Sequence, residues 1–261
     1  MVNRKEKPVD GSVDYHIHLH HSPCTDRGMT AAAIMARARE AELVEIGVVE
    51  HLHPHTDLQI FAAAREEINR ARSVFPGRVW LGVEAEMLDS QGATTIRARN
   101  ELAAAADYVM LAMGHTQLDW VEKPRTSNPE EFIDGEARSL LTALTANRVD
   151  LVAHPFIYGC LHRTHPELAF ALRPHRLDAA LRRDLAQCLV DKDTSLEYHC
   201  RDLIVRPQNL GGEDFVSSWL ELMTYFRAQG VRFVPGSDAH YLEQIGRTRQ
   251  APSWACNYLP L

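Results

Sequence analysis

The stretch SVDYHIH, residues 12–18, is a β-rich run that ends in two histidines. Because side chains two residues apart on a strand point to the same face, His16 and His18 can reach one metal ion. In that arrangement Tyr15 and Ile17 pack on the opposite face. The stretch therefore predicts a strand with a metal-binding pair at its C-terminal end.

Six further β-rich runs follow, and they begin near Glu45, Val79, Tyr108, Val149, Thr194 and Val231. Helical patterns with apolar residues three and four apart lie between them. Thr30 can cap the first helix, Thr56 or Asp57 can start the second, and Gly230 stops the last. This alternation is typical of βα units around a parallel sheet. With no repeat or linker in the pattern, residues 1–261 are expected to form a single α/β barrel domain.

The composition narrows the range of partners. A net charge of −7 argues against a general nucleic-acid surface, so no stable nucleic-acid partner is expected. No apolar run approaches the ~18 residues that span a bilayer, and the polar opening lacks a signal-peptide core, so we expect a cytoplasmic protein without membrane contact.

Five cysteines without a Cys-x-x-Cys pair favour reduced thiols. The 14 histidines cluster in short polar segments. Because imidazole is the commonest metal ligand, this clustering indicates a metal site.

Every predicted strand ends in residue types that bind metals. Besides the first pair, these are Glu50, His51, Glu84, Glu86, His115, His154, Glu197, His199, Asp238 and His240. The C-terminal ends of parallel strands meet on one rim, so these side chains predict a polynuclear site with nitrogen and oxygen ligands. Asp14 shares the face of the first histidines and can accept a hydrogen bond from an imidazole N–H.

The order of these motifs resembles the polymerase and histidinol phosphatase (PHP) family over nearly the whole chain. The resemblance rests on Asp-x-His-x-His at 14–18, Glu-His at 50–51, Gly-Val-Glu at 82–84, Gly-His at 114–115, Ala-His-Pro at 153–155 and Ser-Asp-Ala-His at 237–240. It implies a distorted seven-stranded (β/α)7 barrel with a three-metal centre at the C-terminal rim that hydrolyses phosphate esters. Glu-His at 50–51 and His-Ser-Pro-Cys at 21–24 are closest to the histidinol-phosphate phosphatase branch, which implies a small phosphorylated substrate such as L-histidinol phosphate.

The resemblance also implies the ligands of three divalent ions, whose identity as Zn, Mn or Fe stays open. These ligands are His16, His18, His51, Glu84, His115, His154, Asp238 and His240, with Glu84 bridging two ions. The family supplies one more ligand from the loop after the first strand, and Asp26 is expected to provide it here. Because this loop looks longer than usual, His20, His21 and Cys24 are alternatives.

A water molecule activated by the ions is the expected nucleophile. Asp238 or His240 would handle its proton, and His199 or a loop histidine would assist the leaving alcohol. Arginines suit phosphate because the guanidinium fork matches its oxygens. The arginines expected to bind substrate, each in a loop after a strand, are Arg163, Arg206 and Arg247. The oligomeric state leaves no readable trace.

Other functions compete with this one. A phosphodiesterase or nucleotide phosphatase of the same family would use the same centre. An amidohydrolase-type C–N hydrolase commonly bridges its metals with a carbamylated lysine, but none of the four lysines stands at a strand end. A degenerate barrel kept for binding would lack ligands, whereas the set here is complete.

Several residues receive a structural interpretation. Glu86, two residues past Glu84 and on the same face, either supports the metal ligands from behind or lies on the surface, and the surface is the favoured interpretation. His53 and His55 are interpreted as polar loop, and Trp80 and Trp219 as core. Residues 114–130 and 155–173 directly follow strands and are either substrate loops or plain surface excursions.

Overall fold

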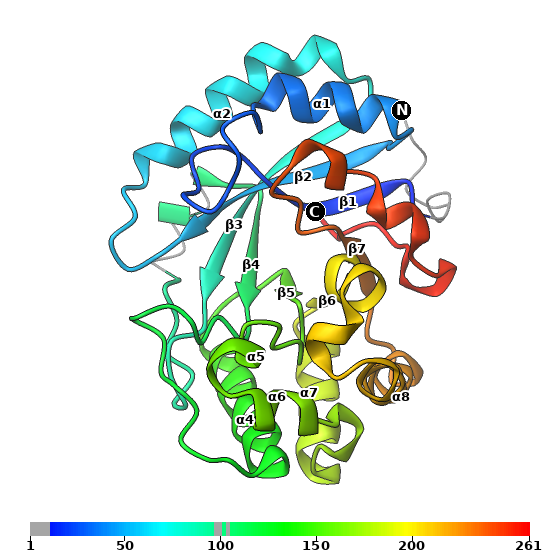
Figure 1. Ribbon diagram of the computed structural model, residues 1–261. Helices are drawn as coiled ribbons and strands as arrows, with labels where there is room; N and C mark the ends of the chain where they lie inside the picture. The colour runs from blue at the N-terminus through cyan, green and yellow to red at the C-terminus, as the bar shows by residue number, and fades with distance from the viewer. Residues whose placement is uncertain (1–10, 97–100, 103–104) are drawn as a thin grey trace.

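The computed structural model describes residues 11–96, 101–102 and 105–261 (Figure 1). Within these residues, seven parallel strands lie in chain order: β1 (Val13–His18), β2 (Glu45–Leu52), β3 (Arg78–Glu86), β4 (Tyr108–Ala112), β5 (Leu151–Ala153), β6 (Ser195–His199) and β7 (Phe233–Gly236). The sheet curves until the chain after β7 meets β1. There the His18 N–H donates to the Ala239 carbonyl (2.9 Å) and the Ala239 N–H to the His16 carbonyl (3.2 Å). The predicted seven-stranded α/β barrel is therefore confirmed, and each strand begins within two residues of its predicted start.

Helices connect the strands: α1 (Ala31–Glu40), α2 (Gln59–Ala71), α4 (Pro129–Ala146), α5 (Leu161–Thr164), α6 (Pro166–Ala171), α7 (Ala179–Asp191) and α8 (Glu213–Ala228). Thr30 caps α1 as predicted, because its hydroxyl accepts from the Ala33 N–H at 3.3 Å. Leu58 precedes α2 without a side-chain cap, although Asp57 accepts from the Gln59 N–H at 3.0 Å. In the described ranges, no helix is both long and apolar enough to cross a bilayer.

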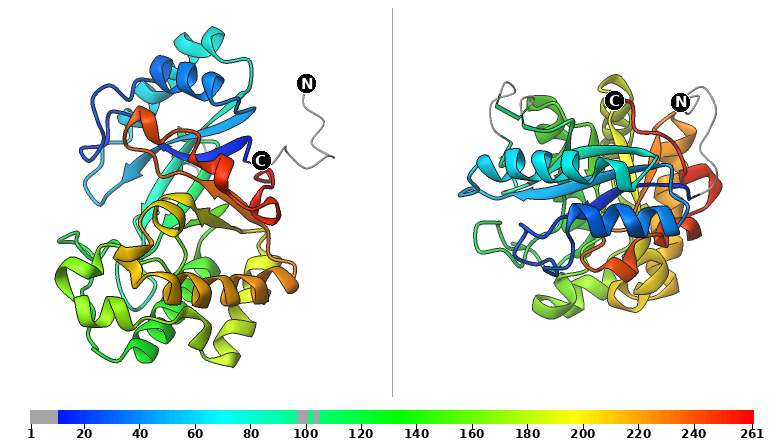
Figure 2. Two further views of the ribbon diagram at one scale, coloured as in Figure 1. Left: turned by 45° about the vertical axis from the view of Figure 1, so that its right-hand side comes forward. Right: turned by 90° about the horizontal axis from the view of Figure 1, so that it is seen from above.

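Short helical turns fill the longer loops. The 3₁₀ turns are Arg72–Val74, Pro174–Arg176, Pro207–Leu210, Leu242–Gln244, Arg247–Gln250 and Ser253–Ala255, and Arg201–Val205 forms a π-helical turn after β6. Figure 2 shows α1 and α2 on one side of the strands and the layer from α4 to α8 on the other. The loop at 155–173 contains α5 and α6, so it is more ordered than a plain excursion.

Two apolar clusters sit on opposite faces of the strands. The larger packs the outer strand faces against the helices and includes Trp219, which is fully buried as predicted. The smaller fills the barrel interior around Tyr108, whose hydroxyl donates to the Tyr15 carbonyl at 2.7 Å. Gly47 and Gly82 leave room for this side chain, since an added Cβ would come within 2.2 Å of its hydroxyl oxygen at Gly47 and within 2.3 Å of its Cζ at Gly82. This packing fills one end of the barrel and leaves the C-terminal end to the polar residues.

A β-bulge interrupts β1 between Asp14 and Ile17. Ile17 joins the outer core as predicted, but Tyr15 joins the inner cluster and donates to Glu45 at 2.8 Å. The expectation that Tyr15 packs away from the histidine face is therefore wrong, because the bulge turns consecutive side chains inward.

Candidate metal centre

The end of β1 brings two imidazoles together with two carboxylates. The Nε2 atoms of His16 and His18 are 3.1 Å apart, and both residues are fully buried. Asp238 follows β7, and its Oδ1 lies 3.2 Å from His18 Nε2. Glu84, near the end of β3, places Oε1 3.5 Å from His16 and Oε2 3.4 Å from His18. The barrel closure thus joins predicted ligands from the first and last strands.

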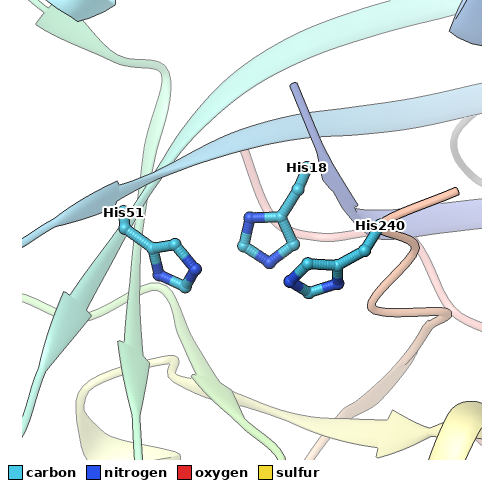
Figure 3. Close-up of side chains that lie close together, drawn as sticks. All are labelled: His18, His51 and His240. Atoms are coloured by element: carbon cyan, nitrogen blue, oxygen red, sulfur yellow. The ribbon is translucent and has the colours of Figure 1, made fainter. Parts of the chain in front are cut away.

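A second group shares His18 with its neighbours on β2 and after β7. Figure 3 shows His18, His51 and His240 with their rings turned toward a common space, and ligand atoms of the three lie within 4.8 Å of one another. The His51 Nδ1 also lies 2.9 Å from Glu84 Oε2. The three imidazoles therefore form a nitrogen-rich position beside the first group.

Glu84 stands between these groups and the next two strands. His154, directly after β5, has its Nε2 3.3 Å from Glu84 Oε1. The rings of His115 and His154 are 4.8 Å apart. Burial alone would raise the pKa of Glu84, but the charges of His51 and His16 hold that pKa well below its usual range. Glu84 is the central carboxylate of the cluster.

Glu86 is fully buried, so its interpretation as a surface residue is wrong. Its carboxylate lies 2.7 Å from His115 Nδ1 and 3.6 Å from His53 Nε2. His53 is half-buried and stacks on His51, whereas His55 is exposed as expected of a polar loop. The signal for Glu86 was its position two residues after Glu84, on the same strand face.

Glu197 and His199 support the cluster from β6. Glu197 lies 2.8 Å from His16 Nδ1 and accepts from the His154 backbone N–H at 2.6 Å. Gly236 makes this possible, because an added Cβ there would meet the Glu197 carboxylate at 1.8 Å. His199 is enclosed, with Nδ1 3.2 Å from Glu197 and Nε2 3.3 Å from Asp202. Burial would lower the pKa of His199, but the charge of Glu197 raises it to about 9.

The Asp14 carboxylate accepts from backbone N–H groups and not from the imidazole that the sequence predicts. Its Oδ1 accepts from the backbone N–H groups of Ser237 (3.0 Å) and His16 (3.2 Å), so it ties β1 to the segment after β7. Burial raises the pKa of Asp14 to about 7.

The first loop brings Cys24 to the cluster and leaves Asp26 outside it. The Cys24 Sγ lies 3.3 Å from His51 Nε2. Asp26 is exposed, and its carboxylate accepts from the Gly28 N–H at 2.7 Å. His20 and His21 turn instead to Glu67, at 2.9 Å and 3.6 Å.

A pocket of about 140 Å³ opens beside His115 and His154, and its lining includes Arg163, Arg201 and Arg206. The sequence motifs did not indicate Arg201. It lies in the π-helical turn after β6 and forms an ion pair with Asp238. No pattern in the sequence marks that turn, so only its position directly after a strand could have indicated Arg201.

Arg247 lies near this arginine group but outside the pocket lining. Its Nη1 is buried and has no hydrogen-bond partner among the described residues. Burial and then the charges of Arg206 and Arg201 lower its pKa. A positive region therefore adjoins the carboxylate and imidazole cluster.

The cluster fits divalent cations. Two buried polar atoms of the cluster, His18 Nδ1 and Glu86 Oε1, have no hydrogen-bond partner among the described residues. Leaving such atoms unpaired in a buried site is costly, and a cation would compensate them. Imidazole and carboxylate together suit Zn²⁺, Mn²⁺ or Fe²⁺.

The chain matches no family model and no curated protein. Among solved structures, an uncharacterised protein is 11% identical over 91% of this chain and 70% of its own, with a TM-score of 0.41. A Bifidobacterium adolescentis protein named "putative metal-dependent phosphoesterase" is 13% identical over 90% of both chains, with a TM-score of 0.39. The catalytic domain of a mannanase from Streptomyces sp. SirexAA-E is 12% identical over 90% of this chain and 81% of its own, with a TM-score of 0.30. Likenesses of this strength do not define a family.

Proposed function

We propose that this protein is a metal-dependent phosphoesterase that hydrolyses a small phosphate monoester. The observation that carries the proposal is the contact between two kinds of site: buried imidazoles and carboxylates on the rim, and an arginine-lined pocket beside them. A phosphate dianion is complemented by divalent cations on one side and by guanidinium groups on the other. An overall acidic chain can bind an anionic ester in this way, because bound cations dominate the local field.

The proposed ligands of three cations come from all the strand ends except β6. They are His16, His18, His51, Glu84, His115, His154, Asp238 and His240, and Glu84 is proposed to face two of the ions because it contacts four of the histidines. Divalent cations held there would lower the pKa of a water molecule and neutralise the charge that develops on the phosphoryl group.

Asp238 is the proposed acceptor of the proton from the attacking water. One of its oxygens faces His18 at 3.2 Å, and the other pairs with Arg201. His240 is the alternative acceptor, with Nδ1 3.3 Å from Asp238 Oδ1. Arg201 would orient Asp238 and also present donors to the ester.

His199 was expected to assist the leaving alcohol. Both of its ring nitrogens face carboxylates and the residue is fully buried, which favours a role in orienting Glu197 and Asp202. The substrate-binding roles of Arg163 and Arg206 are supported by their place in the pocket lining. Arg247 stays a proposed substrate-binding residue, but it lies outside the pocket lining, beside Arg206 and Arg201.

L-Histidinol phosphate is the first substrate we would test, because the motifs resemble the histidinol-phosphate phosphatase branch and the pocket suits a small ester. The metal-replete protein should release inorganic phosphate, and Asp238→Asn should slow release by about 10²–10⁴-fold. If the Asp238→Asn protein keeps its metals and its full rate, Asp238 is not the proton acceptor.

Two chromogenic esters separate the alternatives within this function. p-Nitrophenyl phosphate should be hydrolysed faster than bis(p-nitrophenyl) phosphate if the substrate is a monoester, and the reverse order would indicate a phosphodiesterase. Nucleoside monophosphates test the nucleotide phosphatase alternative in the same assay. Failure to cleave any phosphate ester with metals bound would overturn the proposal.

The amidohydrolase alternative finds less support. Lys123 and Lys192 are the lysines among the described residues, and both donate to backbone carbonyls: Lys123 to Thr116 at 2.8 Å and Lys192 to Thr145 at 3.2 Å. Glu84 holds the central position in which that class commonly uses a carbamylated lysine.

A further inference from the structure

The loop after β1 is fixed against the metal cluster at two points. Glu50, buried on β2, accepts from the His21 backbone N–H at 3.2 Å and from the Ser22 hydroxyl. Four residues further on, the Asp26 N–H donates to the His240 carbonyl at 3.0 Å. The segment between these points therefore lies over the ends of β2 and β7.

Cys24 is the side chain that this segment directs at the cluster. Its Sγ lies 3.3 Å from His51 Nε2, and His240 is the second imidazole that interacts electrostatically with the thiol. These are two of the three imidazoles whose ligand atoms lie within 4.8 Å of one another, as Figure 3 shows. The third, His18, is fully buried. The Cys24 sulfur thus lies beside two imidazoles of this three-histidine group.

Asp26 is unsuited to the same task in this arrangement. Its Oδ1 is held by the Gly28 N–H at 2.7 Å, and its side chain lies on the exposed surface of the loop. An added Cβ on Gly28 would stand 2.8 Å from that oxygen, so the turn brings carboxylate and backbone close together. The carboxylate stabilises the turn that precedes α1.

We propose that Cys24 is a thiolate ligand of the cation held by His18, His51 and His240. This position would then be a sulfur-containing site that favours Zn²⁺, because thiolate is a soft ligand that suits Zn²⁺ beside imidazole. The neighbouring positions, with more carboxylate oxygens, have no such preference. The inference rests on the metal centre of the proposed function, and it assigns the first-loop ligand to Cys24 instead of Asp26.

Cobalt substitution tests the ligand directly. Co²⁺ bound to a thiolate gives a sulfur-to-metal charge-transfer absorption in the near ultraviolet, which imidazole and carboxylate ligands do not give. The band should be present in the Co²⁺-loaded wild type, absent in Cys24→Ser, and unchanged in Asp26→Asn. Cys160→Ser is the matched thiol control, because Cys160 lines the neighbouring pocket. This substitution should leave the charge-transfer band unchanged. A wild type without the band, or a Cys24→Ser protein that retains it, overturns the proposal.

Alkylation gives a second measurement that needs no variant. Cys24 should react with iodoacetamide at least tenfold more slowly in the Zn²⁺-loaded protein than in the metal-stripped protein, as followed by mass spectrometry of the Cys24 peptide. Equal rates overturn the proposal even if Cys24→Ser fails to fold.

Metal content and phosphate release, measured on the same samples, separate this inference from the proposed function. Phosphate release with bound metals but no charge-transfer band rejects the Cys24 ligand alone. The band without hydrolysis of any phosphate ester supports the ligand and rejects the phosphoesterase.

Discussion

Glu86 is a buried carboxylate that contacts a proposed metal ligand, His115. It is fully buried and its Oε2 lies 2.7 Å from His115 Nδ1, so it fixes the ring orientation and leaves Nε2 directed at the centre. We expect Glu86→Gln to lower metal affinity or phosphatase activity by about 10–100-fold, the usual effect of removing such a partner. Competition with a chelator measures the affinity, and phosphate release measures the rate.

The control for Glu86 is an exposed carboxylate far from the rim. Glu40, at the end of α1, has a side chain that is 63% exposed, and Glu40→Gln should leave both quantities unchanged. A Glu86→Gln protein that behaves like this control would show that His115 needs no orienting partner.

The convergence of His16, His51, Glu84 and Asp238 could be predicted, because the strand ends repeat the same residue types and meet on one rim. Residues whose position depends on the path of a loop could not be predicted in this way. Arg201 reaches Asp238 through a π-helical turn, and the loop after β1 brings Cys24 rather than Asp26 to the imidazoles. Hydrogen bonds across the fold fix both paths, and a local pattern carries no information on them.

The strand β3 shows how backbone space shapes the barrel interior. Gly82 faces the Tyr108 ring, and an added Cβ would come 2.3 Å from its Cζ. We expect Gly82→Ala to lower the free energy of unfolding by about 1–3 kcal/mol, because the ring is enclosed and cannot shift without strain. Urea denaturation measures the change.

Gly135, within α4, is the matched glycine. No atom lies within 4 Å of a Cβ added there, and alanine favours helix over glycine by up to about 1 kcal/mol. Gly135→Ala should therefore be neutral or stabilising. Equal destabilisation by both substitutions would contradict the packing argument.

The helix α4 carries a carboxyl group that makes stability depend on pH. Burial, and then the charge of Glu122, raises the pKa of Glu136 from 4.5 to about 7. The folded state thus holds a proton that the unfolded state releases near pH 4.5. The stability from this group is complete below that pH and is lost as the pH rises through about 7.

Glu136→Gln removes that dependence. The melting temperature of the variant relative to the wild type should therefore rise between pH 5 and pH 8. Thermal unfolding of both proteins across this range gives the difference directly, and a difference that stays constant with pH would contradict the assignment.

Most elements follow from local signals, and the deviations have specific causes. Thr30 caps α1 as predicted, and the seven strand starts lie close to their predicted positions. The inward turn of Tyr15 was missed because a bulge in β1 depends on pairing with β2, which the sequence of one strand does not encode. Asn128 caps α4 ahead of the apolar pattern at 132–148.

The metal cluster connects residues from the ends of β1, β2, β3 and the segments after β4, β5 and β7. Without cations, the buried carboxylates and imidazoles lose their compensation, so chelation should destabilise the fold. Each ion present at about 100 times its Kd contributes about 2.7 kcal/mol. In a protein of this size that corresponds to a fall in Tm of about 5–10 °C on adding EDTA. Differential scanning calorimetry measures it.

Restoring Zn²⁺ should restore the Tm, which distinguishes loss of metal from irreversible damage. If the stripped and loaded proteins melt at the same temperature, the ions do not hold the barrel together. The proposed cluster would then be a site that binds metal without contributing to the fold.

The contact between β1 and the segment after β7 has a consequence for biosynthesis. Ser237 and His16, joined by a hydrogen bond of 3.2 Å, lie 221 residues apart in the chain. At about 5–20 residues per second, a ribosome delivers Ser237 roughly 10–40 s after His16. During that interval β1 has one unpaired edge and its two histidines lack Asp238 and His240. The full cluster therefore forms only after translation of the last strand, and until then β2 is the neighbouring strand available to β1.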